Sequence, residues 1–431
     1  MSAPMRRLVL AMFAAAIVAV SGAGLAKEKA GKPKPPPSKH TQVIRAETYK
    51  RMEASQKAFE AKNYADAVAA LDAIKAREQK LNDYERATLY SLYASIAYAQ
   101  EKLPEAIAAY RKVLEQPNLP EGLRDSSLYA LAQLYFISGD HARTVSVIKQ
   151  WSGVATTPSP EGQALMAQAY YQMQKYAEAE AAVVASLRIT RDRKQAPKES
   201  ALALLRAIHY ERKDYARAAK VLEVLVAQFP GKSTYWQQLA GMQGLLERQR
   251  QQVTILHAAH RGRLVGAESD VLNLARLYMV QGAPYAAARL IAQGLSDERI
   301  QPNAQNLELY AQALALSREY DKQIPVLEKL SRLSGQSRHF LYLGQAYIEV
   351  GRWKDAAGAF RAALKRPGAD GEASIHMQLG AALFNAGELV EARQHFFAAS
   401  RAPLQAVTAA NWVKFVDSEL QRRDAVKELR G

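Results

Sequence analysis

The sequence of 431 residues contains no cysteine. This absence excludes disulfides, thiolate zinc sites, cysteine nucleophiles and a lipidated N-terminal cysteine. With 23 glycines and 17 prolines, the chain has too few of either for a collagen-like or low-complexity protein. Acidic residues are also scarce, because 42 of them face 58 basic residues and the net charge is +16. Such a surface suits anionic lipid, cell-wall polymer, nucleic acid or an acidic partner, and charge alone does not choose among them.

Apolar residues are plentiful but are not gathered into long runs. They make up 49% of the chain, and the mean hydropathy is −0.26. These values are typical of a soluble protein that forms a core, and they argue against wholesale disorder. The length is enough for two or three ordinary domains or for one long array. The unbroken apolar stretch at residues 8–20 is too short for an ordinary membrane-spanning helix, and no other stretch approaches the length of a span.

Residues 1–26 have the pattern of a secretory signal peptide. Arg6 and Arg7 precede the apolar run at residues 8–20, and small residues follow up to Ala26. The pattern predicts export with cleavage after Ala26. The alternative is an uncleaved signal that anchors the protein in the inner membrane.

Residues 27–45 are predicted to be a disordered tether. Its first part, Lys27 to Lys39, is rich in lysine and carries four prolines, so it has nothing to bury in a core and favours an extended conformation. One interpretation is a solubilising linker. The other is electrostatic contact with an anionic membrane or cell wall, and both remain open at this stage.

From residue 46 to residue 403 the sequence repeats itself. The clearest unit begins at Ser337, and the next begins at Ala373 with matching residues at the same offsets. The first of these units is marked by Leu343, Gly344, Tyr347, Gly351, Trp353, Ala356, Phe360, Ala363 and Pro367. Its successor is marked by Leu379, Gly380, Leu383, Gly387, Leu389, Ala392, Phe396, Ala399 and Pro403. Weaker copies in the same phase start near positions 48, 87, 125, 160, 199, 233, 268 and 304.

This pattern resembles the tetratricopeptide repeat family, whose unit is a helix–turn–helix of 34 residues. The apolar positions recur at three- and four-residue steps, which independently predicts two amphipathic helices in each unit. The predicted fold is therefore all-α: a right-handed superhelix, or α-solenoid, of about ten such units. Residues 404–431 are predicted to form a C-terminal capping helix and tail, because an array of this kind needs a solvated end.

Several local features are expected within this array. Gly344 and Gly380 stand where the two helices of a unit must approach closely, and a glycine or charged turn is expected between those helices. Units longer than 34 residues are expected to place the extra residues in inter-repeat turns, as at 78–83 and 191–197. The final helix is expected to pack on the tenth unit through four apolar residues, namely Trp412, Val413, Phe415 and Val416.

No enzymatic constellation stands out. The chain has no glycine-rich phosphate loop and no Gly-x-Ser-x-Gly motif. His257 and His260 are three residues apart, a spacing that suits two metal ligands on one helix face, but no third ligand at helical spacing completes a site. We therefore predict no catalysis, no cofactor and no metal.

The resemblance implies a peptide-binding groove lined by the first helix of each unit. In this chain, the resemblance assigns to the groove a row of aromatic and glutamine side chains and one arginine. The candidate residues are Tyr98, Gln133, Phe136, Gln168, Tyr171, Tyr210, Arg276, Gln312 and Gln345. Amides bond a peptide backbone and rings pack its side chains. The alternative is that the aromatic residues only fill space between adjacent helices.

Segments such as Leu81-Asn82-Asp83-Tyr84-Glu85-Arg86, Tyr235-Trp236-Gln237-Gln238-Leu239 and Leu272-Asn273-Leu274-Ala275-Arg276-Leu277-Tyr278 extend the resemblance. They look like the exported tetratricopeptide proteins found with TonB–ExbB–ExbD systems of Gram-negative bacteria. That resemblance implies a periplasmic, non-enzymatic scaffold with TonB, ExbB or ExbD components as partners, and no nucleic acid. Alternatives are an envelope assembly factor for outer-membrane proteins, pili or exported polysaccharide, and a regulator that binds peptidoglycan or lipid through its tether.

Overall fold

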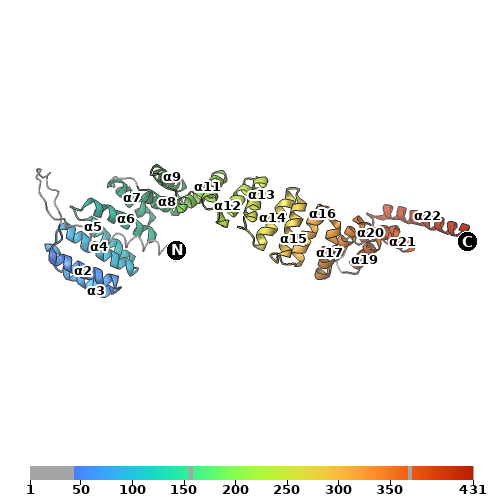
Figure 1. The fold of residues 1–431 in the computed structure, drawn as a ribbon, viewed down its shortest axis with the longest axis horizontal. Helices are drawn as coiled ribbons and strands as arrows, with labels where there is room; N and C mark the ends of the chain where they lie inside the picture. Colours follow the sequence, from blue (N-terminus) through green and yellow to red (C-terminus); the bar gives the residue numbers. More distant parts are fainter. Residues whose placement is uncertain (1–42, 155–158, 367–370, 431) are drawn as a thin grey trace. The chain divides into compact units, whose positions relative to one another are not determined.

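The computed structural model describes residues 43–154, 159–366 and 371–430, and these residues form helices and turns without a strand. The predicted signal peptide and nearly all of the predicted tether lie outside the described residues. The described helices follow one another as ten helix–turn–helix pairs and a final helix, as Figure 1 shows in chain order. The prediction of an all-α solenoid of about ten units with a capping helix is confirmed.

The chain divides into two compact units, and the boundary between Val221 and Leu222 falls within α11 (Tyr215–Gln228). The first unit contains α2 (Ala46–Glu60), α3 (Tyr64–Lys75), α4 (Asp83–Ala99), α5 (Leu103–Leu114), α6 (Glu121–Ile137), α7 (His141–Val154), α8 (Pro160–Gln172), α9 (Tyr176–Asp192) and α10 (Glu199–Glu211). The second contains α12 (Ser233–Leu245), α13 (Gln249–Arg261), α14 (Glu268–Val280), α15 (Pro284–Ser296), α16 (Ala304–Leu316), α17 (Tyr320–Ser334), α18 (Ser337–Glu349), α19 (Trp353–Leu364), α20 (Glu372–Asn385), α21 (Leu389–Ala399) and α22 (Ala406–Arg430).

Each of the ten pairs has the same turn of three residues between its helices. The second turn residue always has a left-handed backbone, and the third donates its N–H to the carbonyl five residues earlier, as Asp214 does to His209 over 2.8 Å. This is the Schellman motif, which satisfies the last carbonyls of the first helix. The left-handed positions are Lys62, Glu101, Gly139, Gln174, Lys213, Glu247, Gly282, Arg318, Gly351 and Gly387. The predicted glycine or charged turn is thus present in every pair; in the fourth, glutamine takes the left-handed position and Lys175 supplies the charge.

A left-handed backbone conformation at lysine is energetically unfavourable, so replacing such a lysine with glycine is expected to stabilise the protein. Lys213 is exposed and has φ of 57°. The substitution Lys213→Gly is expected to raise the free energy of unfolding by about 0.5–1 kcal/mol, because glycine adopts this conformation without a Cβ clash. The matched control is Lys220→Gly, in the exposed interior of α11, which is expected to cost about 1 kcal/mol. Urea unfolding of the two variants checks the opposite signs, and destabilisation by both would contradict the argument.

The extra residues of the longer units lie only partly where the sequence predicted. Between α3 and α4 they form the short 3₁₀ helix η2 (Glu78–Lys80), as expected for an inter-repeat turn. At the expected turn 191–197, however, α9 continues to Asp192, so part of that insertion lengthens a helix. The expectation for that turn was wrong in this respect, because a helix lengthened by one turn keeps its backbone hydrogen bonds and needs no new loop.

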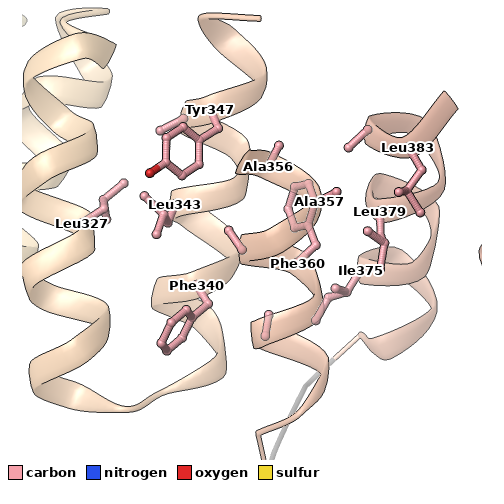
Figure 2. Close-up of a cluster of buried hydrophobic side chains, with 14 of the residues drawn as sticks. Leu327, Phe340, Leu343, Tyr347, Ala356, Ala357, Phe360, Ile375, Leu379 and Leu383 are labelled. Atoms are coloured by element: carbon pink, nitrogen blue, oxygen red, sulfur yellow. The ribbon is translucent and has the colours of Figure 1, made fainter. Parts of the chain in front are cut away.

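An extended apolar cluster joins α16 to α22 of the second unit, and separate clusters join α14 to α16 and α12 to α14. Figure 2 shows Phe360 of α19 between side chains of α18 and of α20. Phe360 is fully buried, and a Cβ added at Gly344 of α18 would lie 2.4 Å from its ring. The next pair repeats the arrangement, with a Cβ at Gly380 lying 2.8 Å from the ring of Phe396. The predicted close approach at both glycines is confirmed, and its partner in each case is a phenylalanine ring.

The first unit is also held together by apolar clusters and by a glycine packed against an aromatic ring, at other positions. Among the described residues, its buried apolar side chains form clusters built on α2–α4, on α4–α7 and on α8–α10. Gly162 of α8 meets Trp151 of α7, and an added Cβ would overlap the indole ring at 1.9 Å. Glycine therefore marks a close helix contact in this unit as well, here between successive pairs.

The final helix, α22, packs on the tenth pair. Val416 is fully buried, Trp412 and Val413 are partly buried against the same cluster, and the ring of Trp412 stacks on Phe396 with centroids 5.0 Å apart. Phe415 is 54% exposed, although its ring lies 5.5 Å from that of Phe384. Of the four predicted contacts, Phe415 is therefore the peripheral one.

Candidate functional site

All nine predicted groove residues lie on the first helix of a pair. In the first unit they occupy α4, α6, α8 and α10, and in the second unit α14, α16 and α18. None of them is buried, and Tyr210, Arg276, Gln312 and Gln345 are exposed. These positions are compatible with a binding role, but the structure does not gather all nine residues in one place.

The four aromatic residues each stand in the last turn of a first helix. Three of these rings face the first residue of their own second helix: Phe136 faces His141 at 5.2 Å, Tyr171 faces Tyr176 at 5.7 Å, and Tyr210 faces Tyr215 at 5.8 Å. Tyr98 packs at the edge of the α4–α7 cluster. The rings therefore help to close the turn within each pair while one side remains accessible.

Two of the predicted amides, Gln312 and Gln345, line one cavity of the second unit. This cavity of about 350 Å³ is formed by α16, α17 and α18. Its floor is apolar, with Ala311, Leu327 and Leu330 among its residues. The polar side chains that line it are Glu308, Gln312, Tyr320, Gln323, Tyr342, Gln345 and Glu349. No lysine or arginine lines it, although the chain as a whole carries a net charge of +16.

The charge at one end of the cavity is partly compensated. Glu308 pairs with Arg338 at 3.3 Å and lies 3.6 Å from Nε2 of His339. Burial lowers the pKa of His339, which opposes the effect of the nearby carboxylate, so this ring is neutral at pH 7. Glu349, at the end of α18, is exposed. The cavity therefore offers a carboxylate at a solvent-accessible edge, where a cationic side chain can meet it.

The amide row continues one pair further than the sequence analysis predicted. Gln345 donates from Nε2 to Oε1 of Gln378 on α20 over 3.0 Å. Gln378 follows Gln345 by 33 residues, as Gln345 follows Gln312, so the repeat spacing itself contained this signal. Tyr320 and Tyr342 were missed for a different reason, because neither stands at the aromatic position that the resemblance singled out.

The first unit contains a second cavity, of about 340 Å³, that the sequence did not predict. Lys75, Lys102 and Lys112 line it together with Tyr90 and Tyr93. The hydroxyl of Tyr90 donates to Glu78 and that of Tyr93 to Asp72, each over 2.5 Å. Burial and the hydrogen bond to Glu78 raise the pKa of Tyr90 to about 12, so the hydroxyl stays protonated. Both hydroxyls therefore already have acidic partners within the unit.

The structure places the two histidines that the sequence analysis weighed as metal ligands on α13. Nδ1 of His257 bonds the hydroxyl of Tyr278, and His260 is partly buried on the same helix. Within the described ranges, no three or more histidine, aspartate or glutamate side chains are grouped as metal ligands. In that same part of the chain, no helix combines the length and apolar character needed to span a bilayer.

Comparison with known families finds helical repeats over much of the chain. The family described as tetratricopeptide repeat matches residues 53–120, 165–233 and 341–406. The family described as anaphase-promoting complex, cyclosome, subunit 3 matches residues 119–186. No protein with a curated description matches the chain.

Several solved structures are similar to this chain. A tetratricopeptide repeat protein from Parabacteroides merdae is 16% identical, covers 69% of this chain and 98% of its own, and has a TM-score of 0.38. The TPR2AB domain of yeast Sti1, in complex with pHSP90, is 14% identical, with coverage of 65% and 99% and a TM-score of 0.34. YrrB, described as a TPR protein with an unusual peptide-binding site, is 14% identical, with coverage of 45% and 100% and a TM-score of 0.36.

The repeated helix pairs and the family matches agree on the class of protein. Three separate segments match the tetratricopeptide repeat, and the ten helix pairs share one turn geometry. The chain is an α-solenoid of helix pairs, and it contains three segments that match the tetratricopeptide repeat.

Proposed function

We propose that this chain is a non-enzymatic scaffold that binds an extended segment of a partner protein in the cavity of α16, α17 and α18. The observation that carries the proposal is the lining of that cavity, which has exposed amides, two tyrosines and two carboxylates over an apolar floor. Amides bond a peptide backbone, and rings pack its side chains. Glu308 is already paired with Arg338, whereas Glu349 is exposed at the edge of the cavity and can select a lysine or arginine of the partner.

We also propose a cellular role that is more specific than peptide binding, and this proposal rests on the sequence. The N-terminal pattern supports export to the periplasm, with an uncleaved inner-membrane anchor as the alternative. The resemblance to exported repeat proteins supports an accessory role in a TonB-type transport system, with TonB, ExbB or ExbD components as candidate partners. The alternatives are an envelope assembly factor and a regulator held on anionic membrane or peptidoglycan by Lys27–Lys39. Cell fractionation with sequencing of the mature N-terminus tests export, and a full-length chain in the cytosol would contradict it.

The binding proposal predicts that a photo-crosslinking amino acid at Gln345 captures a basic segment of one partner. The same probe at Lys354, which is exposed on α19 and does not line the cavity, serves as the control position. Mass spectrometry of the cross-linked peptide identifies the partner and the segment together. Equal capture from both positions, or a captured segment without lysine or arginine, would contradict the proposed site.

Substitutions in the cavity then give the energetics with the captured peptide. Tyr342→Ala is expected to weaken binding about 30-fold, corresponding to about 2 kcal/mol for an aromatic anchor. Glu349→Lys is expected to weaken it through charge repulsion, whereas Glu178→Lys, exposed on α9, changes the net charge equally and should have little effect.

Phe136→Ala and Tyr171→Ala distinguish the two interpretations of the aromatic row. Loss of affinity with unchanged melting supports a groove in the first unit, and lower melting with intact affinity assigns these rings to packing.

A further inference from the structure

The first helices α12, α14, α16 and α18 of the second unit each leave one stripe of side chains exposed. On α14 the exposed residues, at steps of three and four, are Ser269, Asn273, Arg276 and Val280. Residues at these steps lie on one face of a helix. The stripes of α16 and α18 include Gln312 and Gln345, which line the proposed binding cavity. Because the helix pairs repeat, the stripes of α12 and α14 lie on the same face of the second unit as the cavity.

The last residue of this stripe is aliphatic in three successive pairs. Leu245 on α12, Val280 on α14 and Leu316 on α16 are 50%, 67% and 63% exposed. Each stands two residues before the left-handed residue of its turn, and the next pair has Glu349 at that position, at the edge of the cavity. Exposed apolar residues scattered singly need no explanation. Three at one repeat position form an aliphatic row that leads to the cavity.

Two charges of opposite sign lie beside the aliphatic row. Arg276 precedes Val280 by one helical turn on α14, and Glu349 ends α18. Both charged side chains are exposed. Between them, Gln312 and Gln345 supply amides that can bond a peptide backbone. A segment bound here meets a cation on α14 and a carboxylate on α18, so charge complementarity decides which part of it lies on which helix.

We propose that the binding site extends from the cavity over α14 to α12 and takes an amphipathic segment of a partner protein. A basic residue of that segment faces Glu349, and an acidic residue faces Arg276. Its apolar residues lie along the aliphatic row, where the partner covers side chains that are otherwise exposed to water. The extended site rests on the proposed function, which is binding of an extended segment in the cavity, and adds the class of sequence that the segment has.

Selection from a phage-displayed library of random peptides against the mature chain tests this class of sequence. The selected peptides are expected to share a basic residue, a run of apolar residues beside it, and an acidic residue within or beyond that run. Selection against Arg276→Glu is expected to replace the acidic residue with lysine or arginine, because only the charge on α14 has changed sign. Retention of the acidic residue by peptides selected on this variant would overturn the proposal.

The aliphatic row is tested with one labelled peptide from the selection and a matched pair of variants. Leu316→Ser is expected to weaken binding about tenfold, because an apolar contact with the peptide is lost. Leu333→Ser is the control and is expected to leave the affinity unchanged, since Leu333 is 58% exposed but belongs to a second helix, α17. Fluorescence anisotropy measures the affinities, and melting curves check that each variant is folded. Equal effects of the two substitutions would contradict a role for the row.

Tyr342→Ala, in the cavity, separates failure of the extended site from failure of the proposed function. If Tyr342→Ala weakens binding of the peptide whereas Leu316→Ser and Arg276→Glu do not, the segment binds in the cavity alone and the extension is wrong. If no peptide is selected, or if Tyr342→Ala has no effect, the proposed function itself fails. Self-association of the chain that Leu316→Ser abolishes, measured by analytical ultracentrifugation, would assign the row to a second copy and overturn the assignment to a partner protein.

Discussion

Replacing Phe360 with alanine is expected to be among the most destabilising single changes in the second unit, at about 3–5 kcal/mol. The ring is completely buried and belongs to the cluster that joins α18, α19 and α20 (Figure 2). Truncation removes the apolar burial of the ring and leaves a cavity that the surrounding helices cannot fully close. Hydrogen exchange resolved by helix is the appropriate measurement, because neighbouring pairs of a repeat array unfold partly independently.

A second substitution makes this prediction specific to the contact between Phe360 and Gly344. In the wild type, a side chain at Gly344 would collide with the ring, since its Cβ would lie only 2.4 Å away. In the Phe360→Ala background that space is vacant, so Gly344→Leu is expected to restore part of the lost stability. Alone, Gly344→Leu is expected to destabilise the protein. A double-mutant cycle measures the coupling, and simple additivity of the two costs would show that the glycine and the ring do not share one space.

Replacing Gly380 with leucine is expected to cost about 1–3 kcal/mol or more by overpacking. The added Cβ would lie 2.8 Å from the ring of Phe396, and that ring stacks on Trp412. The substitution therefore disturbs both the pairing of α20 with α21 and the docking of α22. We expect hydrogen exchange to rise first in α20–α22, because stability in such arrays is coupled between nearest neighbours.

Gly358→Leu is the matched control for this change. Gly358 also stands inside a helix, but it is exposed and nothing lies within 4 Å of an added Cβ. Leucine there is expected to stabilise α19 by several tenths of a kcal/mol, because glycine is a poor helix former. Similar destabilisation by both leucines would point to a general effect of glycine replacement, and exchange that rises evenly over all ten pairs would contradict nearest-neighbour coupling.

The repeat pattern was informative because each pair is built from local contacts. Apolar residues three and four positions apart predicted the helices, and the spacing of units predicted the pairs. The role of Gly344 followed from a small residue at a helix crossing, although its partner Phe360 was not named. The glutamines at 312 and 345 were placed correctly on first helices, and the same 33-residue spacing leads on to Gln378.

The candidate sites were harder to predict, because they depend on how helices lie against one another. Tyr342 and Glu349 line a cavity only because α16 and α18 pack beside α17. The sequence could not decide whether the aromatic residues belong to a groove or to the packing between helices. In the structure, Phe136 and Tyr171 contact the second helix of their own pair and are also partly exposed.

The class of architecture could be predicted from the amino-acid sequence: an all-helical array of about ten units, with close helix contacts at Gly344 and Gly380 and a helix at the end. The pattern that predicts a helix pair lies within one repeat, and it recurs in each repeat along the chain. Which side chains share a cavity and which rings close a turn became clear only from the packing of the helices. These arrangements depend on interhelical packing over a few ångströms, where one side chain changes its neighbours without altering the repeat pattern.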